Sequence, residues 1–142
     1  VIKVGADSKV ELKEKKDRVE DAIYATKAAL KEGIVPGGGV ALLNAALNIK
    51  EDNAGEEILS KAILSPFRTI LSNAGMKPQT PENEGEGIDV VTGNTVNMIE
   101  HGIIDPLLVT KSALQNASSV ATTILSTDCV INNLRIGDES NR

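Results

Sequence analysis

The segment KEGIVPGGGVALLNAAL, residues 31–47, places a proline and three consecutive glycines between two runs that favour helices. Glycine adopts positive φ at little cost and lets another group approach the main chain closely. Two interpretations are open from these residues alone: a turn that binds a ligand through its backbone, or a flexible connection. The sequence contains neither GxxxxGK[ST] nor GxGxxG, the patterns that identify phosphate-binding and dinucleotide-binding loops.

The composition predicts a mainly α fold with short peripheral β-strands. Of the 142 residues, 41% are hydrophobic and 25% are charged, which is typical of a globular protein with a buried core. Aromatic residues make up only 1%, so Ala, Val, Ile and Leu must fill that core. This mixture favours packed helices over strands rich in aromatic side chains.

Charge and cysteine content argue against several classes of partner and site. The net charge of -5 and the scarcity of aromatic residues argue against nucleic acid, which needs cationic and stacking surfaces. No membrane partner is expected, because no apolar window approaches the length of a membrane span and no secretory leader opens the chain. The lone Cys129, expected to be buried, cannot form an intrachain disulfide, and neither it nor His101 has partners at metal-ligand spacing.

Periodicity predicts three helices in the first half of the chain. A long, mostly exposed helix runs from Ser8 to Gly33, where glycine ends it, and a short helix follows the glycines directly. A third helix over 53–75 has a broad apolar face, so it is predicted to be largely buried and to kink at Pro66. Residues 76–87 contain two prolines and two glycines without periodicity, which predicts a surface loop.

The second half is predicted to alternate between strand and helix. A strand is expected over 88–92 and a two-turn helix over 94–100. Asp105 and Pro106 have the typical composition of a helix start, with the carboxylate as cap, and predict a helix over 106–127.

Two further strands are predicted at the ends, over 1–4 and 129–134. Two isolated strands do not form a stable sheet, and the chain begins with Val1 within an alternating pattern. We therefore expect a fragment or a processed product.

Three aspartates are candidates for a functional role, each with a structural alternative. Asp21 lies three residues after Arg18 on the exposed helix, where a surface ion pair accounts for it. Asp89 stands among apolar neighbours, either as an edge residue that faces water or as a ligand contact. Capping the following helix is a sufficient role for Asp105.

Three long motifs resemble a known family. They are KVGADSKVELKEKKDRVEDAIYATKAALKEGIVPGGGVALL, then VNMIEHGIIDP, then VTKSALQNASSVATTIL. Together they resemble the C-terminal part of the GroEL-like, group I chaperonins of bacteria and organelles, ring proteins that fold other proteins with ATP. The resemblance extends over nearly the whole chain.

The resemblance implies a domain organisation. Residues 1–32 look like the last part of the intermediate, or hinge, domain, and residues 33–142 look like the second half of the helical equatorial domain. In the family, the aspartate of the RVEDA motif, here Asp21, orients or activates the attacking water when the hinge closes.

The resemblance also implies nucleotide contacts. The middle glycine of PGGG, here Gly38, touches the nucleotide. Asp89, Val90 and Val91 match the segment beside the adenine, and Asp105 matches an acid near the ribose. The segment 76–87 is shorter than in the family, which changes this wall of the pocket.

The implied cofactor is ATP, with Mg²⁺ held by residues outside these 142. The family's phosphate loop and magnesium-binding aspartate belong to the first half of the equatorial domain. The full-length parent is therefore expected to be an ATPase and this chain alone to be nearly inactive.

The implied partners are other subunits in heptameric rings, a co-chaperonin and unfolded client proteins. The implied compartment is the bacterial cytoplasm, with the mitochondrial matrix or plastid stroma as alternatives. A different class of function, a helical protein-interaction module without nucleotide dependence, is the alternative to a chaperonin.

Overall fold

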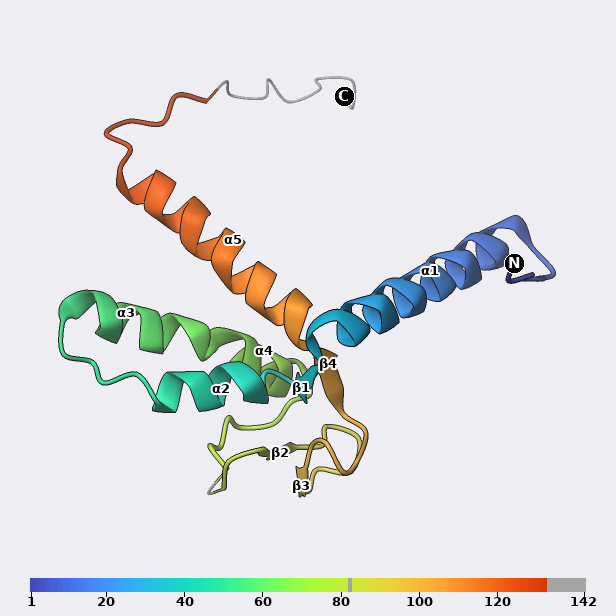
Figure 1. The fold of residues 1–142 in the computed structure, drawn as a ribbon, viewed down its shortest axis with the longest axis horizontal. Helices are drawn as coiled ribbons and strands as arrows, with labels where there is room; N and C mark the ends of the chain where they lie inside the picture. The colour runs from blue at the N-terminus through green and yellow to red at the C-terminus, as the bar shows by residue number, and fades with distance from the viewer. Residues whose placement is uncertain (82, 133–142) are drawn as a thin grey trace, which may run out of the picture. The chain divides into compact units, whose positions relative to one another are not determined.

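The computed structural model describes residues 1–81 and 83–132, and helices dominate them. The chain divides into two units, residues 1–110 and 111–142, and the site lies in the first. The predicted mainly α fold class is confirmed. The elements in chain order are α1 (Lys9–Glu32), β1 (Ile34–Pro36), α2 (Val40–Leu47), α3 (Ala54–Ile63), α4 (Ser65–Asn73), β2 (Glu86–Ile88), β3 (Thr95–Asn97), β4 (Ile104–Pro106) and α5 (Leu107–Leu125) (Figure 1).

Helix α1 begins and ends where the sequence predicts. The Ser8 hydroxyl accepts a hydrogen bond from the Glu11 N–H at 3.2 Å, and the Glu11 carboxylate accepts one from the Asp7 N–H at 3.3 Å. At the other end Gly33 has φ 86° and donates its N–H to the Ala29 carbonyl at 2.8 Å. Ala28 is the buried residue of this helix, so α1 is as exposed as predicted.

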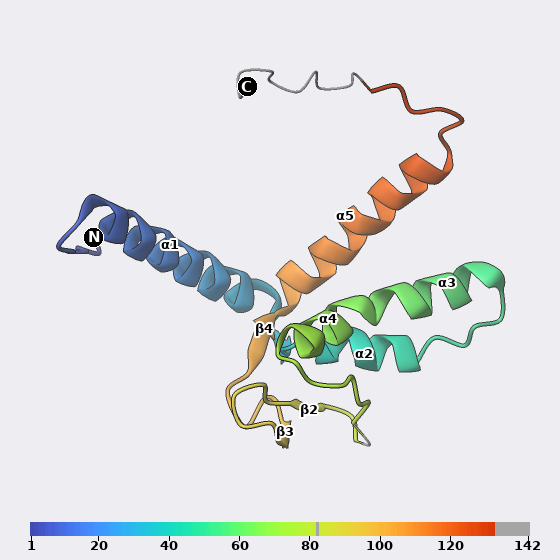
Figure 2. The same cartoon turned by 180° about the vertical axis from the view of Figure 1, so that it is seen from behind.

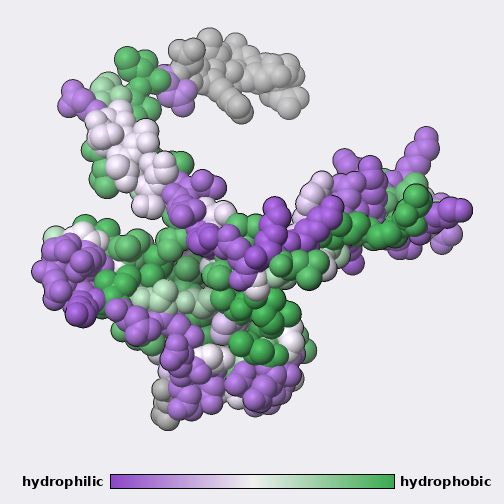
Figure 3. Space-filling view, in the orientation of Figure 1, coloured by the Kyte–Doolittle hydropathy of each residue, from purple (hydrophilic) through white to green (hydrophobic). Residues whose placement is uncertain are grey.

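Helix α2 lies alongside α3 and α4 in both views (Figures 1 and 2). In place of one helix with a kink at Pro66, the structure has two helices separated by Leu64. Pro66 lies in the first turn of α4, where a helix does not need the N–H that proline lacks. The prediction that this region is largely buried is wrong for one face. Ile58 is 68% exposed and Leu47 of α2 is 65% exposed, and hydrophobic residues reach the surface over these helices (Figure 3).

The core of the first unit joins these helices to the 85–98 segment. Its buried members come from α2, α4 and the residue after β3: Val40, Leu43, Phe67, Leu71 and Met98. Two antiparallel pairs of strands border it. β1 pairs with β4, with Val35 opposite Asp105, and β2 pairs with β3, with Gly87 opposite Val96.

The three consecutive glycines form the tight turn between β1 and α2. A Cβ on Gly37 would lie 3.1 Å from the Ile103 carbonyl group, and one on Gly39 would lie 2.8 Å from the backbone of Phe67. Gly39 also has φ 80°. Both residues are therefore required by packing within the chain, and the turn is not simply a flexible connection.

Several predictions for the 88–106 region are wrong. The strand predicted over 88–92 lies at β2 instead, and the predicted helix over 94–100 is β3 followed by turns. Asn97 explains the difference, because its side-chain oxygen accepts hydrogen bonds from the N–H groups of Ile99 and Glu100 at 3.1 and 3.3 Å. Such a side-chain turn competes with a helix that has too few residues to propagate.

The described parts of the two predicted terminal strands are also not strands. Residues 1–4 have no strand, nor do residues 129–132, while 133 and 134 lie outside the described residues. Cys129 was expected to be buried and is exposed.

Helix α5 begins one residue later than predicted, at Leu107, since Asp105 and Pro106 belong to β4. None of its 19 residues, all of them described, is buried. No helix among the described residues has the length and apolar character to cross a membrane.

Replacing Gly39 with alanine should destabilise the chain far more than replacing Gly102. Both residues have positive φ, 80° and 72°, but no atom lies within 4 Å of a Cβ on Gly102, whereas one on Gly39 meets backbone. We expect Gly102→Ala to cost about 1–2 kcal/mol from its backbone conformation. Gly39→Ala should cost at least about 2 kcal/mol more from overpacking. Urea unfolding of both variants measures the difference, and equal losses would contradict the packing argument.

Candidate functional site

The glycine turn is the first part of the candidate site. Gly38 has φ 65°, and a Cβ there would lie 2.9 Å from Cε of Met98. Its N–H and that of Gly39 have no protein acceptor among the hydrogen bonds of the described residues. Because Gly39 is also the N-cap of α2 and provides no side-chain bond, these donors are available to a ligand.

Asp89 forms a compact turn directly after β2. Its carboxylate accepts hydrogen bonds from the Val91 N–H at 2.9 Å and the Thr92 hydroxyl at 2.8 Å. These bonds, chiefly that from Val91, hold the pKa of Asp89 below its ordinary value. Within the turn, Val90 is 41% and Val91 is 89% exposed, so two apolar side chains face solvent.

Asp105 lies in the strand that pairs with β1, next to the glycine turn. The Gly37 N–H donates to the Ile103 carbonyl at 2.9 Å, which continues the β1–β4 pairing into the turn. Partial burial raises the pKa of Asp105 above its ordinary value. The predicted role of Asp105 as helix cap is wrong, because it lies within β4, and its carboxylate has no hydrogen-bond partner in the part of the chain that the structure describes.

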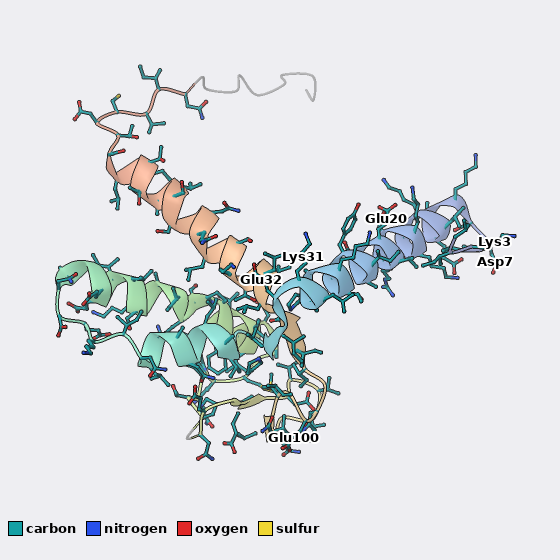
Figure 4. All side chains as sticks on the ribbon, in the orientation of Figure 1. Lys3, Asp7, Glu20, Lys31, Glu32 and Glu100 are labelled. Carbon is teal, nitrogen blue, oxygen red and sulfur yellow. The ribbon has the colours of Figure 1, made fainter. Side chains whose placement is uncertain are left out.

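Asp21 lies apart from these three segments. It is exposed on α1, and helical geometry places it roughly 18 Å from Gly33 along the helix axis. Figure 4 shows its neighbour Glu20 well along α1 from the end of the helix, where Lys31 and Glu32 lie. The expected ion pair with Arg18 is not formed, since Arg18 binds Glu14 at 2.7 Å.

The structure thus brings together the neighbourhoods of Gly38, Asp89 and Asp105, but not Asp21. The shared contact is Met98, which the sequence interpretation did not single out. Only its apolar character within VNMIEHG suggested burial.

Two other features lie outside this arrangement. A cavity of about 320 Å³ is lined by Gln79, Thr80, Pro81, Asn83, Glu86, Ile88 and Thr95, and includes none of the predicted site residues. Residues 1–81 and 83–132 contain no group of three His, Cys, Asp or Glu side chains arranged to bind a metal ion.

Comparison with known proteins relates the chain to chaperonins. The sequence model described as the TCP-1/cpn60 chaperonin family matches residues 1–135. Among solved structures, the chain is similar to one described as "Crystal structure of group III chaperonin in the open state", with 28% sequence identity and a TM-score of 0.79. The match covers 90% of this chain and 30% of that chain, so the present chain spans less than a third of its length.

Replacing Asp105 with asparagine should stabilise the chain at neutral pH. Its folded-state pKa lies above the ordinary 3.8, so the folded state binds its proton more readily than the unfolded state does. The charged form is therefore unfavourable in the fold at pH 7, and this penalty disappears as the pH falls through the raised folded pKa toward 3.8. We expect Asp105→Asn to raise the free energy of unfolding at pH 7, with a gain that shrinks on acidification. Urea unfolding of wild type and variant, at pH 7 and at a pH near 3.8, measures the gain in stability.

Asp89→Asn is a control for which we expect the opposite change in the free energy of unfolding at pH 7. The folded-state pKa of Asp89 lies below 3.8, so its carboxylate stabilises the fold above that value, and this stability is lost as the pH falls through the folded pKa. The variant should lower the free energy of unfolding at pH 7. Effects of the same sign for both variants would contradict these assignments.

Proposed function

Because the chain belongs to the TCP-1/cpn60 chaperonin family, we propose that it forms part of an ATP-dependent chaperone that assists the folding of other proteins. In this proposal residues 1–32 end the intermediate domain, and residues 33–142 form the second half of the equatorial domain. The resemblance of the three long motifs to the GroEL-like proteins supports membership of group I. The remaining parts of the subunit lie outside these residues.

The main support for a nucleotide site is the meeting of three segments at the glycine turn. Gly38 and Gly39 present N–H groups without protein acceptors, which suits the oxygen atoms of a nucleotide. Val90 and Val91 present apolar surface, which suits the face of an adenine. The half-buried carboxylate of Asp105 is an acceptor suited to ribose hydroxyls.

Asp21 is the proposed catalytic residue. ATP supplies the phosphoryl group that water attacks, and a carboxylate can orient that water and polarise it. The distance of Asp21 from the glycine turn means that α1 must move toward the nucleotide before it can act. Closure of a hinge that completes a catalytic site is a common device in enzymes.

Mg²⁺ would be held by the first half of the equatorial domain. Without that half, the chain should hydrolyse ATP very slowly, because charge stabilisation provides most of the catalysis in phosphoryl transfer.

The proposed partners follow from the same assignment. Subunits in a heptameric ring would cover apolar side chains that are exposed here on α3 and α5, such as Ile58 and Ile124. A co-chaperonin and unfolded clients would bind parts of the subunit outside these residues. The bacterial cytoplasm is the proposed compartment, with the mitochondrial matrix or plastid stroma as alternatives.

Asp21→Ala in the complete subunit should abolish turnover without abolishing binding. We expect ATP hydrolysis to fall by at least about 100-fold, the scale of losing a positioned general base, while the Kd for nucleotide is unchanged. Steady-state hydrolysis and calorimetric titration measure the two quantities.

Asp17→Ala is the matched control, because Asp17 is an exposed aspartate one helical turn earlier on α1. It should leave turnover unchanged. Equal turnover in wild type and Asp21→Ala would rule out the catalytic role of Asp21. Absence of any nucleotide binding by the wild-type subunit would favour a helical interaction module instead.

A further inference from the structure

Met98 occupies the centre of the candidate site. It is 1% exposed and follows β3 directly. Its Cε lies 2.9 Å from the position that a Cβ on Gly38 would take, and its Sδ lies 2.7 Å from the corresponding position at Gly87. The same side chain therefore contacts the glycine turn and the strand that leads into Asp89.

The backbone of Met98 extends these connections to two further points. Its N–H donates to the Gly85 carbonyl at 3.1 Å, and its carbonyl accepts from the Ile103 N–H at 2.8 Å. Ile103 in turn accepts from Gly37 and directly precedes β4, which contains Asp105. Met98 thus joins all three segments of the proposed nucleotide wall.

We infer that Met98 is a positioning residue that fixes the spacing of Gly38, Asp89 and Asp105 for nucleotide binding. The inference rests on the proposed function. The glycines at 38 and 87 have no side chains of their own to set this spacing. Val40 Cγ2 also lies 2.6 Å from the Cβ position at Gly87, but Met98 is the side chain that comes close to both glycines. Loss of its terminal atoms would let the turn and the β2–β3 pair approach one another or vary in distance.

If Met98 has only a structural role, a different effect on nucleotide binding is expected. As a mere core residue, Met98 would affect nucleotide binding only through the stability of the fold. Leu71 offers the comparison, because it belongs to the same buried cluster, is also 1% exposed, and lies on α4 outside the three segments. A cavity at Leu71 should destabilise the protein without changing the spacing of the site.

The experiment compares Met98→Ala with Leu71→Ala in the complete subunit. The readouts are the urea midpoint, the Kd for Mg·ADP by calorimetry, and kcat and KM for ATP hydrolysis. We expect both variants to lower the midpoint. Only Met98→Ala should also weaken Mg·ADP binding and raise KM, by about tenfold, which is a moderate effect for a group displaced by a fraction of an ångström.

Two further substitutions, which conserve side-chain volume, test the inference if the alanine variants do not fold. Met98→Leu retains bulk beside Gly87 but lacks the terminal methyl that reaches Gly38, and Leu71→Met is the converse change elsewhere in the same core. We expect Met98→Leu to raise KM severalfold with a near-normal midpoint, and Leu71→Met to leave KM unchanged.

The outcomes separate this inference from the function on which it rests. If the wild-type subunit binds Mg·ADP but neither Met98 variant differs from its Leu71 control in Kd or KM, Met98 is only a core residue and the inference is overturned. If the wild-type subunit binds no nucleotide, the proposed function fails and the inference fails with it.

Discussion

The fold of the first unit depends on the absence of side chains at the turn between β1 and α2. Each of the three glycines faces a different element: Gly37 the carbonyl of Ile103, Gly38 the side chain of Met98, and Gly39 the backbone of α4 at Phe67. Any side chain at the first or third position would push apart two elements that share one core. Because packed interiors tolerate little added volume, this turn determines how closely α2, α4 and the residues before β4 approach one another.

The ends of α1 and the position of Pro66 at a helix boundary were predictable because their signals are local. Ser8 and Gly33 cap α1 through bonds to residues three or four positions away, and Pro66 can lie only at a helix start or a break. The strands were not predictable, because β2, β3 and β4 have three residues each, too few to establish a two-residue period. Asp105 and Pro106 suit a helix start, yet pairing with β1 makes them a strand, and that partner lies far away in the sequence.

The candidate site shows the same division between local and distant information. Gly38 drew attention because consecutive glycines are visible in any sequence, but the packing that requires them involves Ile103, Met98 and Phe67 and exists only in the folded chain. Asp89 and Asp105 had adequate structural explanations, so only the resemblance to chaperonins indicated a role for them. Met98 gave no local signal, because its importance comes from contacts with Gly38 and Gly87 that exist only after the chain has folded.

The exposure of α1 is compatible with the role proposed for Asp21. Ion pairs within the helix, such as Lys15 with Glu11 at 2.8 Å, are local, and Ala28 is the residue of α1 that is buried. Displacing the part of the helix before Ala28 would therefore expose little apolar surface. At its end, Gly33 has a backbone conformation that few other residues adopt, and no atom lies within 4 Å of the position of a Cβ there. A change of direction at Gly33 would meet no nearby side-chain obstacle, but it would act on the hydrogen bond that the Leu107 N–H donates to the Gly33 carbonyl at 3.1 Å and on the contacts between α1 and β4. The movement proposed for α1 would therefore pivot at this end of the helix, next to the strand that contains Asp105.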